Sequence, residues 1–537
     1  MKMAFEVLHR DLLGRIGKLT TKSGVLETPA FLPVINPNVQ QVSPKEMFEK
    51  LRFKAVITNA YILKKHFEEE IIDRGVHDLL SYPGAVMTDS GAYQILRYGQ
   101  IDADPIDIAK FQEKINTDIG VILDVPTGWV ASHSYAEMTV KETIRRAEKT
   151  LENLERRDIL WVGPIQGGRY LDLVALSARK MAKLPFDIYA LGSPTQIMEQ
   201  YLFDTLTDMI MTAKINLPPH KPLHLFGAGH PCLFPFIVAL GCDIFDSAAY
   251  AIYAREERYL TENGTIRLQN LEYLPCSCPI CSNLTSDQLK ERWKEERESL
   301  LARHNLYVCM SEIQRVKQAI TEGRLWELLE LRAKSHPSLF QALNNLKKYS
   351  AYLEKHTPVT KGHGIFIYDS TSLHRPEVLR HRLNMTTNYE KPKGLEILLL
   401  LPQISVKPLH SSPQYRRVKK TLERVKRTLN LIHVCFYTTP FGIVPIEIDD
   451  IFPLSQFEMV GQLEGEMKAQ IAEAIIEYVR TNKYKKVLLH PDYGLLDKKT
   501  INRLNKQISI IETTKEIDPW TTEALEDLEE TLKKVDV

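Results

Sequence analysis

The first 250 residues of the sequence predict an α/β fold, a (β/α)8 TIM barrel of eight parallel strands that alternate with helices. Short apolar runs recur there, with helix-like stretches between them, and each run ends near a polar residue or a glycine. No glycine-rich phosphate loop follows the first run, so a doubly wound sheet is the less favoured alternative.

The predicted strands are short runs of apolar and β-branched residues. In chain order they are Ala30–Val34, Ala55–Thr58, Ala85–Thr88, Val121–Leu123, Leu160–Ile165, Ile188–Leu191, Leu223–Phe226 and Ile244–Phe245. Helix-start residues precede the stretches between them. Examples are Asp104-Pro105 before Ile106–Ile115, and Ser134 before Tyr135–Arg157.

The carboxyl ends of these strands are where a barrel carries catalytic groups. One Asp or Asn there would more often cap the next helix. Three aspartates and a glutamine at one edge favour a functional site instead. The residues at the strand ends are Asn59, Asp89, Asp124, Gln166, Gly192, Gly227 and Asp246.

The segment after the eighth strand interrupts the barrel before its last helix. We expect a hairpin around Glu262–Gly264 and then a cysteine-rich loop, which form a zinc-binding subdomain at about 250–310. Ser311–His336 has helical periodicity and is the predicted last barrel helix. A further helix, Ser338–Lys355, leads out of a catalytic domain that we place at 1–345.

Residues 346–537 predict a smaller α/β extension of one or two modules. Apolar runs at Ile365–Tyr368, Leu395–Leu400, Val434–Tyr437 and Val487–Leu489 alternate with helices at Tyr415–Leu429 and Glu464–Thr481. The last predicted element, Thr521–Lys534, is an acidic amphipathic helix.

The length, hydropathy and net charge of the chain restrict the classes of function that it can have. A chain of 537 residues exceeds the roughly 250–300 that one core supports, so we expect at least two domains. No apolar run reaches the roughly 20 residues of a membrane span, and the start of the sequence lacks a secretion signal. The net charge of +1 excludes wholesale electrostatic binding, so a nucleic acid would meet local patches. We expect a cytoplasmic protein.

The cysteines indicate a metal site in a reducing compartment. Cys276, Cys278, Cys281 and His304 supply four N/S ligands, the set of a closed tetrahedral zinc site. Because protein occupies all four positions, no place remains for a catalytic water, and we expect a structural zinc. Chance clustering is the alternative. The remaining cysteines are scattered and predict core thiols: Cys232, Cys242, Cys309 and Cys435.

Two groups of strand-end residues suggest chemistry. Asp89 and Asp246 suit displacement at an anomeric carbon, in which one carboxylate attacks C1′ and the other handles protons. Asp124, Gln166 and the backbone N–H of Gly192 complement the donors and acceptors of guanine. A buried structural polar group is the alternative for each of them.

Two basic segments are candidate phosphate contacts. Arg255 and Arg258, with Tyr259 to stack a base, directly follow the eighth strand. A solvated helix face explains these residues equally well. A denser basic helix in the second domain contains Arg416, Arg417, Lys419, Lys420, Arg424, Lys426 and Arg427.

Taken together, the motifs resemble those of the tRNA-guanine transglycosylases, and most closely their archaeal branch, the 7-cyano-7-deazaguanine tRNA-ribosyltransferases. The resemblance spans residues 1 to about 345. It is carried by TDSGAYQ (Thr88–Gln94), LDVPT (Leu123–Thr127), PIQGG (Pro164–Gly168), FGAGHP (Phe226–Pro231), DIFDSAAY (Asp243–Tyr250) and the Cys3His set. Two later segments, at 374–378 and 444–448, look like the archaeal C-terminal extension.

The resemblance implies an exchange of guanine 15 in the tRNA D-loop for free 7-cyano-7-deazaguanine, on the way to archaeosine. It implies Asp246 as nucleophile, Asp89 as general acid/base, and Asp124, Gln166 and Gly192 as base-binding positions. We expect a homodimer. Family members usually carry an RNA-binding PUA domain, which we do not recognise after Tyr493, so a separate PUA protein is a further expected partner.

Two other functions stay open. One is a diverged paralogue, either an archaeosine synthase-like enzyme or a tRNA-binding subunit, which the loss of a carboxylate would indicate; both are present. The other is a barrel glycoside hydrolase, which needs neither the zinc site nor the guanine-shaped polar set.

Overall fold

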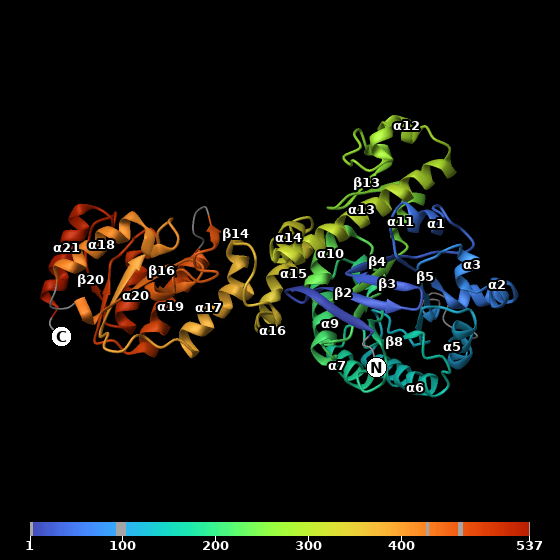
Figure 1. Cartoon of the computed structure of the whole chain (residues 1–537), viewed down its shortest axis with the longest axis horizontal. Helices are drawn as coiled ribbons and strands as arrows, with labels where there is room; N and C mark the ends of the chain where they lie inside the picture. The colour runs from blue at the N-terminus through green and yellow to red at the C-terminus, as the bar shows by residue number, and fades with distance from the viewer. Residues whose placement is uncertain (1–3, 93–103, 426–428, 460–464, 536–537) are drawn as a thin grey trace. The chain divides into compact units, whose positions relative to one another are not determined.

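The computed structural model describes residues 4–92, 104–425, 429–459 and 465–535 (Figure 1). The chain divides into two compact units, Met1–Leu346 and Lys347–Val537. No helix of the described residues is both long and apolar enough to cross a membrane.

The first unit contains an eight-stranded parallel sheet that closes into a barrel, which confirms the predicted (β/α)8 fold. Its strands are β4 (Ala30–Pro33), β5 (Ala55–Asn59), β6 (Ala85–Asp89), β7 (Ile119–Val121), β8 (Leu160–Ile165), β9 (Ile188–Leu191), β10 (Leu223–Leu225) and β11 (Ile244–Ser247). One bridge between Val34 and Ile57 joins the sheet's two ends, with Ile35 N donating to Ile57 O at 2.8 Å. Of the eight predicted strands only the fourth is misplaced. It is expected at Val121–Leu123, and β7 begins two residues earlier.

The alternation of side chains along β6 and β11 determines where the candidate carboxylates lie. Ala85 and Met87 of β6, and Ile244 of β11, belong to the apolar cluster that fills the barrel. Because side chains alternate along a strand, the residue two positions further on points to the same interior. That residue is Asp89 on β6 and Asp246 on β11.

Helices cover the barrel between its strands. They are α1 (Pro44–Glu49), α2 (Ala60–Arg74), α3 (Val76–Leu80), α5 (Pro105–Lys114), α6 (His133–Glu152), α7 (Leu171–Met181), α8 (Thr195–Glu199), α9 (Phe203–Asn216), α10 (Phe234–Ala239) and α11 (Ala249–Arg255). Asp104 caps α5 as predicted, accepting from Ile106 N at 2.8 Å. Helix α6 begins two residues before the expected start, because Ser132 rather than Ser134 accepts from Tyr135 N.

A three-stranded antiparallel sheet precedes the barrel, and the sequence analysis does not predict it. It comprises β1 (Phe5–Asp11), β2 (Gly14–Thr21) and β3 (Gly24–Thr28). The first turn runs through Leu12, at φ 52°, and Leu13, where a turn of this kind usually has Asn or Gly. Buried Arg15 ties this sheet to the barrel, donating to Asp243 from Nε at 2.8 Å and from Nη2 at 2.5 Å.

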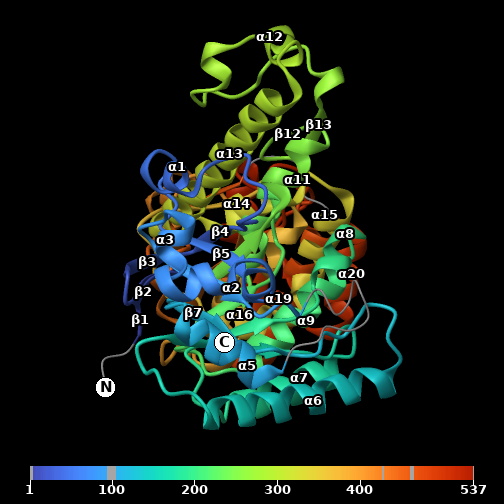
Figure 2. The same cartoon turned by 90° about the vertical axis from the view of Figure 1, so that its right-hand side faces the viewer.

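The segment after the barrel contains the expected hairpin, β12 (Arg258–Leu260) and β13 (Thr265–Arg267). Figure 2 shows the loop that follows, with α12 (Ser286–Lys290), extending away from the barrel. The predicted helix Ser311–His336 is wrong in its bounds. The structure has α13 (Lys294–Glu322) and α14 (Leu325–Ala333), which are separated at Gly323, a left-handed residue at φ 72°.

Two helices replace the single helix predicted at Ser338–Lys355. Helix α15 (Pro337–Asn345) belongs to the first unit, and α16 (Ser350–His356) belongs to the second.

The second unit is an α/β domain, as expected. Its five-stranded sheet has the order β17 (Gly442–Pro445), β16 (Ile432–Thr438), β15 (Ile397–Pro402), β19 (Lys486–Leu489) and β20 (Ile511–Glu512). A separate parallel pair joins β14 (Ile365–Ile367) to β18 (Phe457–Met459). The helices are α17 (Pro376–Thr387), α18 (Pro413–Arg424), α19 (Gly465–Asn482), α20 (Lys498–Gln507) and the predicted acidic helix α21 (Thr522–Lys534).

Candidate active site and metal centre

Asp89 and Asp246 lie at the carboxyl ends of β6 and β11, where the alternation of these strands turns both side chains inward. Oδ2 of Asp89 accepts from Asn59 Nδ2 at 3.2 Å and from Gly91 N at 3.3 Å. Asp246 is buried, and its Oδ1 lies 2.7 Å from Nε2 of His224. An amide and a backbone N–H therefore hold Asp89, and an imidazole lies against Asp246.

Three carboxylates share this part of the barrel. Burial, together with the charges of Asp124 and Asp246, raises the pKa of Asp89 to about 7. Burial also raises the pKa of Asp124 to about 6, although its hydrogen bond from Gln166 opposes that shift. A carboxylic acid with a pKa near neutrality can both donate and accept a proton at physiological pH.

Asp124 and Gln166 form a buried pair across neighbouring strands. Gln166 Nε2 donates to Asp124 Oδ2 at 2.5 Å. Gln166 Oε1 accepts from Thr127 N at 2.9 Å and from Ser193 Oγ at 3.1 Å, which fixes the orientation of the amide. An amide NH2 has two donors, so one N–H remains for a ligand.

Gly192 lies beside this pair for a reason that the sequence analysis did not give. Its N–H donates to Ile165 O at 2.9 Å, so the donor expected to face a purine is engaged within the barrel. A Cβ at this position would fall 2.2 Å from Gln166 Nε2. Glycine is required here because the amide occupies the space of a side chain.

Asn59, His224 and Gly227 all bond to the candidate carboxylates. The sequence predicts Asn59 and Gly227 only as strand-end residues and predicts no role for His224. Gly227 N donates to Asp246 Oδ1 at 3.4 Å. His224 lies one position inside β10, and a polar residue in an otherwise apolar LHL strand is the signal that could have found it.

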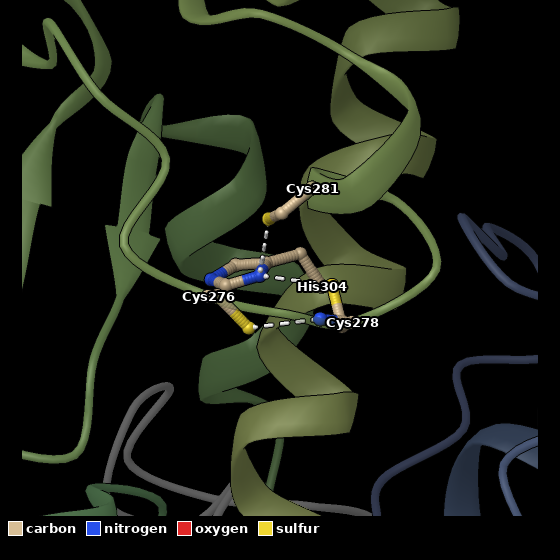
Figure 3. Close-up of side chains that lie close together, drawn as sticks. All are labelled: Cys276, Cys278, Cys281 and His304. Atoms are coloured by element: carbon tan, nitrogen blue, oxygen red, sulfur yellow. Dashed lines mark hydrogen bonds between the residues drawn. The ribbon is translucent and has the colours of Figure 1, made fainter.

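Cys276, Cys278, Cys281 and His304 converge as predicted, with their ligand atoms within 4.8 Å of one another (Figure 3). The thiols come from the loop after β13, and the imidazole comes from α13. His304 Nδ1 lies 3.5 Å from Cys278 Sγ and 3.3 Å from Cys281 Sγ. Three sulfurs and one nitrogen at these separations fit a tetrahedral metal site.

Surrounding contacts orient the ligands. His304 Nε2 lies 2.8 Å from Leu260 O and donates to it, which leaves Nδ1 for the metal. Tyr259 stacks on the imidazole at a centroid distance of 3.7 Å, and its hydroxyl lies 3.2 Å from Cys281 Sγ. Tyr259 is fully buried, so the expectation that it stacks a base is wrong.

The two predicted phosphate contacts do not touch the carboxylates. Arg255 is exposed at the end of α11. Arg258 is half-buried, 3.3 Å from Glu256, and its guanidinium lies over the ring of Tyr253 at 5.4 Å. The four remaining cysteines are buried thiols, as expected.

Comparison with known proteins identifies the barrel unit. The profile of the family described as queuine tRNA-ribosyltransferase matches residues 11–338. The chain belongs to this family, the tRNA-guanine transglycosylases. A profile for a domain of unknown function, DUF5591, matches residues 378–532 of the second unit.

Relatives of the family named tRNA-guanine(15) transglycosylase are similar along most of the chain. A protein of Saccharolobus solfataricus is 45% identical over 493 residues, covering 90% of this chain and 96% of the relative. One of Pyrobaculum aerophilum is 44% identical, covering 93% and 98%. One of Methanocaldococcus jannaschii is 41% identical, covering 89% and 72%. Membership of the family makes the chain a tRNA-ribosyltransferase.

The raised pKa of Asp89 predicts a pH-dependent stability. Folded Asp89 keeps its proton up to about pH 7, whereas the unfolded carboxyl loses it near 3.8, so stability falls as pH rises through this window. Asp89→Asn should remove that loss and be more stable than the wild type at pH 8, by up to about 4 kcal/mol. Urea unfolding at pH 4 and pH 8 measures the effect.

Asp73→Asn is the matched control, because Asp73 is exposed in α2. Equal pH dependence in the wild type and Asp89→Asn would contradict the burial of this charge.

Proposed function

We propose that this chain replaces guanine 15 of tRNA with free 7-cyano-7-deazaguanine, on the way to archaeosine, through a covalent glycosyl-enzyme. The observation that carries the proposal is the pair of inward carboxylates at the barrel mouth, one of which has a pKa near 7. The names of the relatives supply the tRNA position.

In the first step, Oδ2 of Asp246 bonds to C1′ of the nucleotide, and the bond from C1′ to N9 breaks. The electron pair leaves with guanine, which takes the proton of Asp89. In the second step the incoming deazaguanine gives its N9 proton to ionised Asp89 and displaces the carboxylate from C1′. The two steps consume neither water nor ATP.

The buried pair of Asp124 and Gln166 is the proposed base pocket. The carboxylate accepts the N1–H and N2–H groups of guanine, and the remaining amide N–H of Gln166 donates to O6. Because Thr127 and Ser193 fix the amide, the pocket is formed before the base enters. Gly192 leaves room for the Gln166 amide, and its own N–H does not bond to the base.

The covalent step predicts different losses in the two carboxylate variants. Asp246→Asn should abolish both the RNA–protein adduct and base exchange, because an amide is a poor nucleophile. Asp89→Asn should bind tRNA normally and exchange guanine at least about a hundredfold more slowly, the usual size of a lost proton transfer. Denaturing gels and incorporation of labelled guanine measure both. A wild-type level of adduct in Asp246→Asn would assign the nucleophile elsewhere.

For the Cys3His cluster we propose one structural zinc ion per chain. It joins the loop after β13 to α13 and supplies stability rather than chemistry. Cys278→Ala should lose the metal and lower the melting temperature, and the folded fraction should still form adduct. Metal analysis and thermal unfolding test this. Cys309→Ala removes a buried thiol outside the cluster and should retain the metal.

The second unit is proposed to add tRNA affinity through α18. Helix α21 engages part of the basic face, since Arg417 Nη1 donates to Trp520 O at 2.6 Å and Arg424 pairs with Glu529 at 3.2 Å. Lys419 and Lys420 are exposed and form no ion pair with the described residues. Lys426 and Arg427 lie outside the described residues. The free lysines are therefore the proposed phosphate contacts.

Replacing Lys419 and Lys420 together by Gln should weaken tRNA binding and reduce the slope of log K against log salt by about 2, roughly 0.9 per phosphate contact. The control double variant, Lys533→Gln with Lys534→Gln, removes the same charge from the last turn of α21. A slope that falls equally in both would indicate a net-charge effect and not a contact.

A further inference from the structure

His224 is a buried polar residue within hydrogen-bond distance of the proposed nucleophile. It lies on β10, the strand that pairs with β11, and its side chain is fully buried. Nε2 is 2.7 Å from Oδ1 of Asp246. Gly227 N adds a longer contact, 3.4 Å, to the same oxygen. Both donors therefore hold one carboxylate oxygen and not the other.

The second ring nitrogen indicates the protonation state of His224. Nδ1 is buried and has no hydrogen-bond partner among the described residues. The carboxylate of Asp246 is an acceptor, so Nε2 carries the proton of this contact. A doubly protonated ring would also bury an unpaired N–H with its charge, which is costly. The neutral tautomer with hydrogen on Nε2 fits the site.

The aromatic ring of Phe226 limits the movement of the imidazole. The two ring centroids are 4.6 Å apart, with an interplanar angle of 40°. Phe226 packs against the apolar cluster inside the barrel, so the imidazole contacts a ring that this cluster holds in place. A held ring gives its N–H a fixed direction.

We infer that His224 is a positioning residue for Asp246. Its neutral Nε2–H holds Oδ1 and leaves Oδ2 directed at C1′ of the substrate, and it does so without pairing the carboxylate with a cation. An ion pair would hold the same oxygen but would stabilise the anion and weaken its attack. The inference rests on the proposed function, because it assigns a role in adduct formation.

The test compares side chains that do and do not carry a donor at the position of Nε2. Gln places an amide N–H at nearly the same reach, Asn has the same chemistry but is one methylene shorter, and Leu has neither donor. The rate constant of adduct formation at saturating tRNA is the main readout. The Kd for tRNA, the melting temperature and the metal content are measured beside it.

His224→Leu and His224→Asn should form adduct at least about tenfold more slowly, with a tRNA Kd within about twofold of the wild type, because misdirected attack lowers the rate and not the binding. His224→Gln should recover most of the rate. His381→Leu is the matched control, since His381 is also buried and, among the described residues, its side chain bonds to a backbone carbonyl, Ile443 O, and to no carboxylate. It should form adduct at the wild-type rate.

Three results separate the outcomes. Wild-type rates in the Leu and Asn variants would overturn the inference and leave the proposed function intact. Equal losses in Asn and Gln, with equal melting temperatures, would also overturn it, because the donor would not matter. If Leu does not fold, the comparison of Gln with Asn decides. Absence of adduct in the wild-type protein would instead overturn the proposed function.

Discussion

The closed parallel barrel is the constraint on which the site depends. Once the sheet closes, alternate residues of every strand face one interior, and the apolar members of that set leave no room for water. The last inward position of a strand lies at its carboxyl end, beyond these apolar residues. Asp89 and Asp246 occupy that position on two strands, and this makes them both accessible to a substrate and poorly solvated.

Poor solvation explains why neutral groups surround the carboxylates. Asn59, His224 and Gln166 each donate one hydrogen bond to a different aspartate. Among the described residues, no lysine or arginine forms a salt bridge with any of the three aspartates. Cations would lower the pKa of each acid, whereas amides and a neutral imidazole orient an acid and leave it basic. The proposed exchange needs one basic nucleophile and one acid that titrates near neutrality.

The sequence predicted the barrel, seven of its eight strands closely, and the metal cluster, because each depends on local pattern or on spacing. It did not predict β1–β3, whose first turn uses Leu12 and Leu13 instead of turn-forming residues. It also misplaced the long helix, since periodicity persists through Gly323 although the backbone does not. The roles of Gly192 and His224 are contacts between strands, and a single sequence does not show which strands are neighbours.

Helix α13 joins two places that have different requirements. His304, about three turns from the start of α13, belongs to the metal centre, while Val316 and Ile320, further along, are buried in the first unit. One residue inserted between them would turn the imidazole by about 100° and move it by about 1.5 Å. The number of residues between His304 and the buried part of α13 thus fixes the direction in which the imidazole points. A change of length within this stretch of α13 would therefore separate the imidazole from the three thiols.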